Sequence, residues 1–248
     1  MEANIESINK KAFRIDILKK IIIVLFYFLV MDVISTPILQ AIYKASKGEI
    51  DDNLFTIIAQ YIIYIPILIV ALFLSIDEIK YGFKANSKMR YMKPLSYVCV
   101  GIVACYFANY IGSIISQLTS FSTDSVNQEA IEEIFLSKYG ALLILDICII
   151  GPIVEELVFR GCILRGLVKL RINPAIAIII SSIIFGFIHV SSAGDYTQIF
   201  PYIFMGIALG AIFYKSDSIV ESTIVHILLN TISTSLMIIL PIIQSGGF

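Results

Sequence analysis

The chain has 248 residues, of which 58% are hydrophobic and 15% charged, and its mean hydropathy is +0.90. A soluble domain carries about 25% charged residues, and the core of a chain of this length is too small to hide so much apolar surface. Composition therefore excludes an ordinary soluble protein, and the net charge of −1 gives no sign of nucleic-acid binding.

Seven apolar stretches are each long enough to cross the hydrocarbon core of a bilayer, which takes about 20 helical residues. They are residues 21–43, 54–76, 95–119, 141–159, 174–190, 199–214 and 219–243. Helices are the expected form, because an open sheet edge cannot be accommodated in lipid. We therefore expect an all-α fold, a polytopic transmembrane helical bundle with about seven spanning helices.

The basic residues predict how the bundle is oriented. Fifteen of the 18 Lys and Arg residues lie in the N-terminal segment and in alternate loops after it. By the positive-inside rule the N-terminus is then cytoplasmic and the C-terminus outside. The chain divides into a cytoplasmic, basic and amphipathic segment (1–20) and a transmembrane helical domain (21–248). Residues 5–18 and 127–137 predict helices that lie on the membrane surface, with plain solvated connectors as an equal alternative.

A pair of glutamates ends the fourth expected span, in the motif GPIVEELVFRG. Charged residues within a span are costly and are therefore functional candidates. Glu156 and Arg160 are four residues apart and can pair on one helix face. Glu155 is rotated by about 100° from Glu156, so it is free to face a cavity. Pro152, which follows Gly151, predicts a bend or a widened turn that would make room for water.

Both histidines of the chain lie in apolar spans. His189 closes the motif FGFIH and His226 opens the motif HILLN. If the fourth and fifth spans form a hairpin that turns near residue 172, Glu155 and His189 lie at a similar depth. His226 follows closely after a loop, so it reaches the same depth only with a tilted helix or a deep cytosolic cavity. Taken singly, such a histidine is more often a hydrogen-bonding bridge between helices.

The three motifs together resemble those of the CAAX protease and bacteriocin-processing (CPBP, or Abi) family, which includes the type II CAAX prenyl endopeptidases. The shared pattern is a Glu pair with Arg four residues on, Phe four residues before His, and His four residues before Asn. The resemblance covers about residues 140–235. It implies an intramembrane endopeptidase in the cell membrane, with a cavity open to the cytosol. The prenyl endopeptidases of the family look like eight-helix proteins, so an eighth span is the alternative to seven.

The resemblance also implies roles for individual residues. Glu155 is the general base and His189 the second group that orients the water. The oxyanion would be bound by two donors, His226 and Asn230. Three further residues would support this site from behind: Glu156, Arg160 and Phe185.

A metal is the open question about this site. Glu155, His189 and His226 would make a catalytic zinc set with a free fourth position, and Glu156 would then become the base. The HExxH motif, which places two zinc ligands on one helix turn, is absent. We favour metal-free chemistry, in which Glu155 acts on water directly.

Two other functions compete with a protease. One is a non-catalytic membrane protein, for immunity or regulation, that binds a peptide in the same cavity. The other is a transporter with a proton relay, although no inverted repeat is found. The substrate is expected to be a peptide or a membrane protein, because the Ile- and Lys-rich usage is typical of low-GC bacteria, in which CAAX prenylation is not expected. Gly206 and Gly210 form a small-residue face that packs within the bundle or between protomers.

Overall fold

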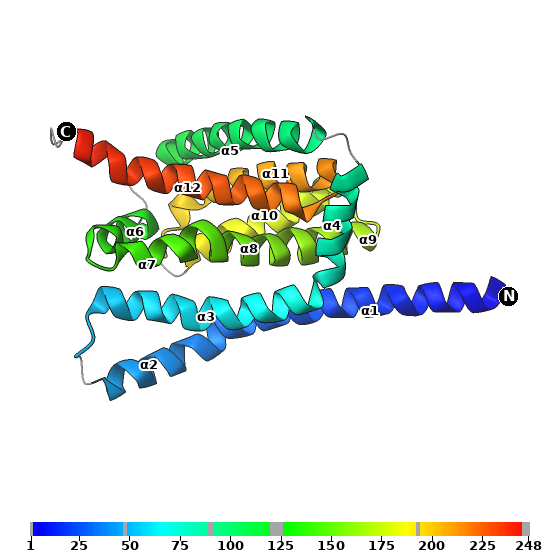
Figure 1. The fold of residues 1–248 in the computed structure, drawn as a ribbon, viewed down its shortest axis with the longest axis horizontal. Helices are drawn as coiled ribbons and strands as arrows, with labels where there is room; N and C mark the ends of the chain where they lie inside the picture. Colours follow the sequence, from blue (N-terminus) through cyan, green and yellow to red (C-terminus); the bar gives the residue numbers. More distant parts are fainter. Residues whose placement is uncertain (1, 47–48, 89–91, 120–125, 192–193, 245–248) are drawn as a thin grey trace.

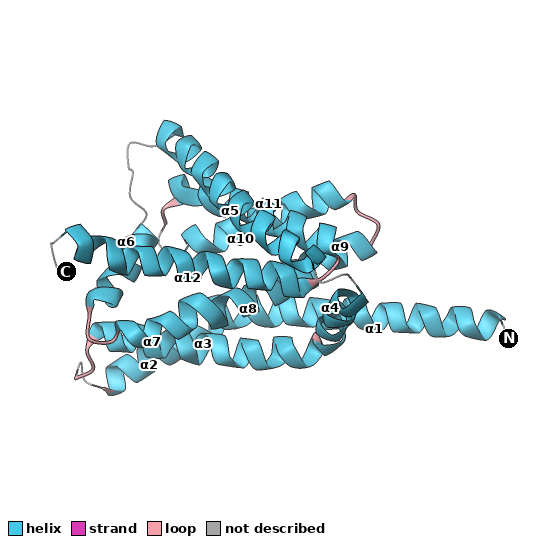
Figure 2. Ribbon diagram, turned by 45° about the horizontal axis from the view of Figure 1, so that its top comes forward, coloured by secondary structure: helices cyan, strands magenta, loops and turns pink. Residues whose placement is uncertain are grey.

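The computed structural model describes residues 2–46, 49–88, 92–119, 126–191 and 194–244 (Figure 1). Within these ranges every regular element is a helix (Figure 2). The expected all-α class is therefore confirmed. The elements in chain order are α1 (Glu2–Phe28), η1 (Leu29–Ile34), α2 (Ser35–Ala45), α3 (Asp52–Leu74), α4 (Ile76–Lys88), α5 (Met92–Thr119), α6 (Val126–Leu136), α7 (Gly140–Leu145), η2 (Asp146–Ile150), α8 (Gly151–Glu155), η3 (Glu156–Leu164), α9 (Arg165–Lys169), α10 (Pro174–Ser191), η4 (Tyr196–Gln198), α11 (Ile199–Ser216) and α12 (Ile219–Gln244).

Among the described residues, six helices are long and apolar enough to cross a membrane. They are Lys10–Ala45, Asp52–Leu74, Pro94–Thr119, Pro174–Ser191, Tyr196–Ser216 and Ile219–Met237. The remaining expected span, 141–159, lies in an unbroken helical run from α7 to α9, which we call the composite helix (residues 140–169). It is not among the six because Asp146, Glu155 and Glu156 place too many charged residues within the length of one span.

The composite helix lies inside the bundle. On one side α1 packs against η3 and α3 packs against η2 and α8, while α10 and α12 pack on it from other sides. In Figure 1, α1 and α3 lie on one side of α8, and α5 lies on the opposite side beyond α11 and α12. Large exposed apolar side chains cover most of the outer helices, whereas Glu155, Glu156 and Arg160 are buried. This distribution is that of a protein whose polar residues face its interior because lipid surrounds it.

The two segments expected at the membrane surface are both helical. Residues 5–18 continue α1 without a break, and in Figure 1 this part of α1 projects beyond the other helices. Residues 127–137 correspond to α6, which packs against α7. The side chains of residues 5–9 and 127–130 lie outside what the structure describes.

The small-residue face of α11 packs within the bundle. A Cβ added at Gly206 would lie 3.0 Å from Ser182 of α10, and one added at Gly210 would lie 3.2 Å from Ile178. The two helices therefore approach closely because these positions lack side chains. Of the two alternatives left open by the sequence, this face serves contact between helices of one chain.

Candidate active site

The composite helix contains two π-helical segments, η2 and η3, and a proline explains the first. In η2 the Gly151 N–H bonds to Asp146 O, five residues back. The next residue, Pro152, has no N–H, so Ile147 O receives no helical hydrogen bond. Asn230 of α12 supplies the missing donor, because its Nδ2 donates to Ile147 O at 2.9 Å. The widened turn expected at Gly151–Pro152 is thus present as a π-helical segment.

Glu155 follows this segment and faces both histidines. Its Oε1 lies 3.8 Å from His189 Nε2, and its Oε2 lies 3.7 Å from His226 Nε2. The exposed fraction of the side chain is 10% for Glu155 and 18% for His189, but only 1% for His226. Separations longer than a direct hydrogen bond suit a water molecule between the groups.

The second ring nitrogen of each histidine is fixed by an acceptor. His189 Nδ1 lies 2.8 Å from Phe185 O, and a carbonyl oxygen can only accept, so this nitrogen carries a proton. His226 Nδ1 lies 3.1 Å from Glu156 Oε1, and that carboxylate is also paired with Arg160. In the neutral form of each ring the lone pair of Nε2 is then directed toward Glu155.

Glu156 and Arg160 form a buried ion pair behind the site. Arg160 Nη1 lies 3.0 Å from Glu156 Oε1, and the two side chains are 1% and 0% exposed. Arg160 Nη2 also donates to Gly206 O at 3.3 Å, and its guanidinium lies 4.6 Å from the centre of the Phe185 ring. Glu156 thus points away from Glu155 and holds His226, as its position one residue further along the helix predicts.

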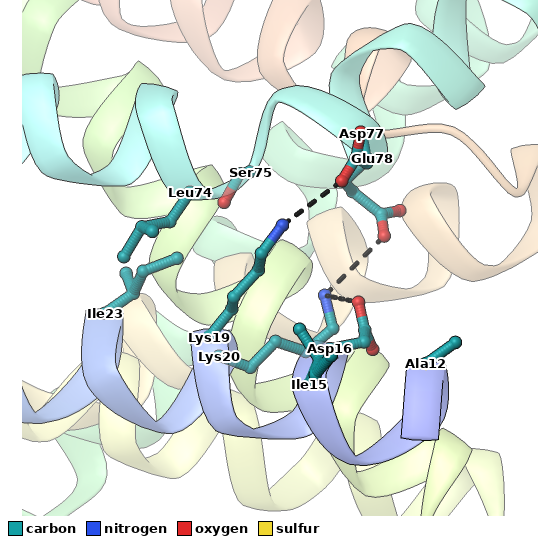
Figure 3. A pocket seen from close by; sticks show the side chains of 10 residues that line it. All are labelled: Ala12, Ile15, Asp16, Lys19, Lys20, Ile23, Leu74, Ser75, Asp77 and Glu78. Atoms are coloured by element: carbon teal, nitrogen blue, oxygen red, sulfur yellow. Dashed lines mark hydrogen bonds and ion pairs between the residues drawn. The ribbon is translucent and has the colours of Figure 1, made fainter. Parts of the chain in front are cut away.

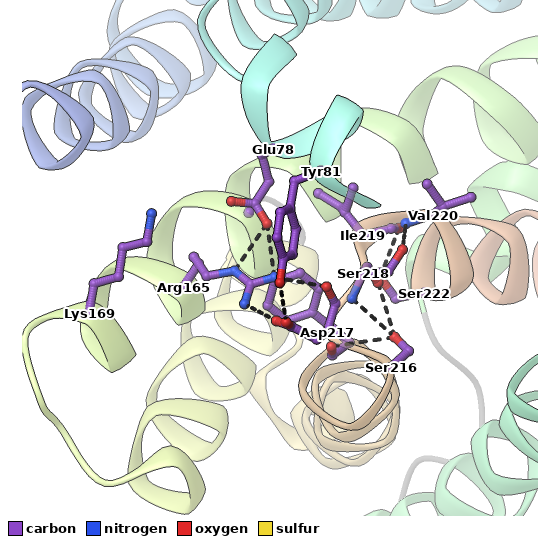
Figure 4. Close-up of polar contacts among 12 residues, drawn as sticks. Glu78, Tyr81, Arg165, Lys169, Ser216, Asp217, Ser218, Ile219, Val220 and Ser222 are labelled. Atoms are coloured by element: carbon purple, nitrogen blue, oxygen red, sulfur yellow. Dashed lines mark hydrogen bonds and ion pairs between the residues drawn. The ribbon is translucent and has the colours of Figure 1, made fainter. Parts of the chain in front are cut away.

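A contact at the N-terminal end of α12 explains how His226 reaches the depth of Glu155. Arg165 pairs with Asp217, in the turn between α11 and α12, and with Glu78 of α4 at 2.9 Å (Figure 4). Asp217 has a left-handed backbone, with φ of 54°. Glu155 is ten residues from Arg165, and His226 is nine residues from Asp217. Because helices rise by a similar amount per residue from this common level, the two side chains meet.

The contact between Arg165 and Asp217 thus accounts for the level of His226, and the tilt of α12 and the deep cytosolic cavity stay predictions. If the loops before α10 and α12 lay at one depth, the start of α12 would be level with the α9–α10 turn. The structure places it level with Arg165, one to two helical turns further into the bundle. The hairpin of the composite helix and α10 does bring His189 to Glu155, as the equal spacing from residue 172 predicts.

Three residues near the site carry no motif in the sequence. Tyr202 of α11 stacks on His189, with ring centroids 4.6 Å apart and an angle of 26°. Tyr64 of α3 and Asp146 of η2 are electrostatic neighbours of Glu155. Asp146 is 3% exposed, and its Oδ1 has no hydrogen-bond partner among the described residues. The packing of α3 and α11 places Tyr64 and Tyr202, so no pattern along the chain indicates them. Asp146 lies on the composite helix itself, and a charged residue within an expected span is its only signal in the sequence.

A tetrahedral zinc site sets the distances between the atoms that bind the metal. Atoms bound to zinc at about 2.0–2.2 Å in a tetrahedron lie roughly 3.3–3.6 Å apart. The two Glu155–histidine separations of 3.7 and 3.8 Å are wider, and the described residues hold no group of three His, Cys, Asp or Glu side chains placed to bind a metal. The fixed Nδ1 protons are those of zinc-binding histidines, and the separations exceed the zinc range by only a few tenths of an ångström, so the choice between metal-free and zinc chemistry stays a prediction.

Comparison with curated proteins gives relatives in three bacteria. An uncharacterized protein of Mycoplasma capricolum subsp. capricolum is 29% identical over 212 residues, which is 81% of this chain and 60% of that protein. The "Putative membrane peptidase YdiL" of Bacillus subtilis is 26% identical over 201 residues, 80% of each chain. The "UPF0177 protein YxdF" of Lactococcus lactis subsp. lactis is 26% identical over 152 residues, 59% of this chain and 80% of that protein. This chain thus spans only 60% of the length of the Mycoplasma relative. No solved structure matches it.

A family model matches the region that contains all three motifs. The matched residues are 137–232, and the model is described as type II CAAX prenyl endopeptidase Rce1-like. Glu155, His189 and His226 all fall within this range. The resemblance noted in the sequence is therefore confirmed, because residues 137–232 match the Rce1-like family model.

Proposed function

We propose that the chain is an intramembrane endopeptidase in which Glu155 activates water to attack a peptide bond. The observation that supports this most strongly is the convergence of one carboxylate and two histidine Nε2 atoms, at 3.7 and 3.8 Å, inside a bundle of apolar helices. The family match and the peptidase-named Bacillus relative support the same reaction class.

In this mechanism Glu155 is the general base. A water molecule bound by Glu155 and His189 transfers one proton to the Glu155 carboxylate. Its other hydrogen stays on the oxygen and makes a hydrogen bond to His189 Nε2. Its oxygen forms a bond to the scissile carbonyl carbon. The C–N bond then breaks, and the proton held by Glu155 passes to the leaving amine. The ring of His189 stays in place because Phe185 O and Tyr202 hold it from two sides.

The oxyanion needs donors that are fixed before the reaction. Asn230 uses one N–H for Ile147 O, and an amide has a second N–H to offer. His226 can donate from Nε2 when both ring nitrogens carry protons, with Glu156 accepting from Nδ1. Glu156 is fully buried and held by Arg160, which favours Glu155 over Glu156 as the base.

The proposed substrate is a peptide or a membrane protein, because the site lies among spanning helices. The proposed location is a bacterial cell membrane, with the N-terminus, α4 and α9 on the cytoplasmic side. Lys and Arg gather in these segments, as the positive-inside rule requires.

Cleavage of a quenched peptide library by the purified full-length chain tests the proposal. We expect Glu155→Gln, which keeps the size of the side chain, to lower the cleavage rate by about 100- to 10,000-fold. Glu133→Gln, at an exposed position of α6, is the matched control and should cleave like the wild type. Parallel assays with a chelator and with added zinc decide between metal-free and zinc chemistry.

The result can also overturn the proposal. If the wild type cleaves no peptide, with or without zinc, while wild type and Glu155→Gln bind the same peptides, the chain is a peptide-binding membrane protein. If Glu155→Gln keeps full activity while Glu156→Gln loses it, the roles of the two glutamates are reversed.

A further inference from the structure

Lys20 of α1 is a buried lysine whose ammonium group points into the bundle. The residue is 7% exposed, and its Nζ donates to Gly161 O at 2.8 Å. Its aliphatic stem passes Gly166, where an added Cβ would lie 3.7 Å from Lys20 Cδ. Lys20 therefore lies along the face of the composite helix that follows Glu155 and Glu156.

The acceptor of this hydrogen bond is a carbonyl that the helix itself leaves free. At the end of η3 the Arg165 N–H reaches back to Arg160 O and Cys162 O. The α-helical spacing resumes from Arg165 onward. A change from five-residue to four-residue spacing skips one carbonyl, and here it is that of Gly161. A buried carbonyl without a donor is unfavourable, and the Lys20 ammonium supplies the donor.

The charge of Lys20 is balanced within the same cluster. Its Nζ lies 3.8 Å from Asp16 and 3.7 Å from Glu78, whose other oxygen pairs with Arg165 (Figure 3). Lys20 Nζ thus has one hydrogen-bond acceptor, Gly161 O, and two carboxylates within ion-pair distance. The cluster joins α1 and α4 to the part of the composite helix where π geometry ends.

Two other roles for Lys20 fit the structure less well. A lysine at a bundle end often extends to lipid headgroups, but the ammonium group of Lys20 is turned inward. The side chain of Lys19 is 36% exposed, and its Nζ pairs with Asp77 at 3.3 Å. A cavity of about 290 Å³ lies beside Lys20. Three carboxylates and two lysines line it, which does not favour an anionic ligand.

We propose that Lys20 is a positioning residue for the active site. By binding Gly161 O it stabilises the π-helical segment η3, and the width of that segment sets the direction in which Glu155 and Glu156 leave the helix. π-Helical turns recur at functional sites because they rotate side chains relative to a regular helix. This inference rests on the proposed peptidase function for its activity readout, but not for its structural one.

The test compares Lys20→Met, Lys20→Arg and Lys19→Met in the full-length chain. Misplacement by about 1 Å can cost 100-fold in rate, so we expect Lys20→Met to lower kcat by roughly that factor while KM stays within about twofold. Lys20→Arg, which keeps a charged donor, should recover most of the loss. Lys19→Met should match the wild type. Thermal melts confirm that each variant is folded at the assay temperature.

Amide hydrogen exchange supplies a readout that needs no peptidase activity. In Lys20→Met we expect faster exchange in peptides covering residues 156–169, with α11 unchanged, and in Lys19→Met no change in either. If the wild type cleaves nothing, the proposed function fails while the exchange result still tests Lys20. If Lys20→Met matches Lys19→Met in both kcat and exchange, Lys20 has no positioning role.

Discussion

Each π-helical segment of the composite helix leaves one backbone carbonyl without a helical donor, and a different kind of side chain supplies the donor in each case. In η2 a neutral amide, that of Asn230, donates to Ile147 O, the carbonyl that Pro152 cannot serve. At the end of η3 an ammonium group, that of Lys20, donates to Gly161 O inside a cluster of carboxylates. In both cases a side chain of a neighbouring helix donates to a carbonyl of the composite helix that has no donor within that helix.

The choice of donor follows from the surroundings. Asn230 lies on α12 one turn from His226, within the spanning part of the bundle, where an unbalanced charge is costly. Lys20 lies beside Gly166 of α9, and Asp16 together with Glu78 of α4 balances its charge; α4 and α9 lie at one end of the bundle (Figure 1). A helix can thus keep a widened turn inside a membrane when a neighbour supplies a donor suited to that depth. Glu155 lies between the two repaired segments.

The largest effect should come from the buried pair at the start of η3, which has no equivalent in η2. We expect Arg160→Met to lower the free energy of unfolding by about 3–5 kcal/mol, because it leaves Glu156 buried without its cation. Denaturant titration in detergent measures this. The double variant Glu156→Gln/Arg160→Met should be more stable than Arg160→Met alone; a double variant that is no more stable would mean that the charge of Glu156 is not the cause.

A smaller effect is expected in η2, where the donor can be replaced from within the helix. Asn230→Ala should cost about 1–3 kcal/mol, because Ile147 O then lacks a donor. Pro152→Ala restores a backbone N–H, so the loss should shrink by more than about 0.5 kcal/mol in the Pro152→Ala background. Stabilities of the four proteins of this cycle test the assignment.

Thr231→Ala is the control for this cycle. Its hydroxyl bonds only to Ile227 O of its own helix, so its effect should be the same in the wild type and in the Pro152→Ala background. Additive losses for Asn230→Ala and Pro152→Ala would show that the amide does not replace the missing proline N–H.

The smallest effect concerns Asp217, which sets the level of α12 through Arg165. Partial burial would raise the pKa of Asp217, but hydrogen bonds from Tyr81 and Arg165 outweigh it and hold the pKa below its ordinary value of 3.8. A lowered pKa in the folded state means that the carboxylate stabilises the fold above about pH 3.8 and that this contribution is lost as the pH falls through the lowered value.

For this exposed pair we expect Asp217→Asn to lower Tm by roughly 1–3 °C at neutral pH. The difference between the two proteins should stay constant down to about pH 5 and close below pH 3.8. Thermal melts across this range measure it. A difference that persists at low pH would mean that Asp217 acts through its left-handed backbone rather than through its charge.

The sequence by itself determined the features that depend on spacing along one or two neighbouring helices. Apolar length predicts the spanning helices, and the four-residue spacing of Glu156 and Arg160 predicts their pair. Equal distances from the turn near residue 172 predict that Glu155 and His189 lie at one depth. These features follow from the helical period and from helix rise, which are the same in every helix.

Only the tertiary structure decided the features that depend on how distant helices are set against one another. Arg165 and Asp217 link the start of α12 to the composite helix, and this contact brings His226 to the level of Glu155. Tyr202, Asn230 and Lys20 act on carbonyls or rings of other helices, over separations in sequence that follow no period. The register between two packed helices is set by such side-chain contacts, and a sequence pattern within each helix carries no information about it.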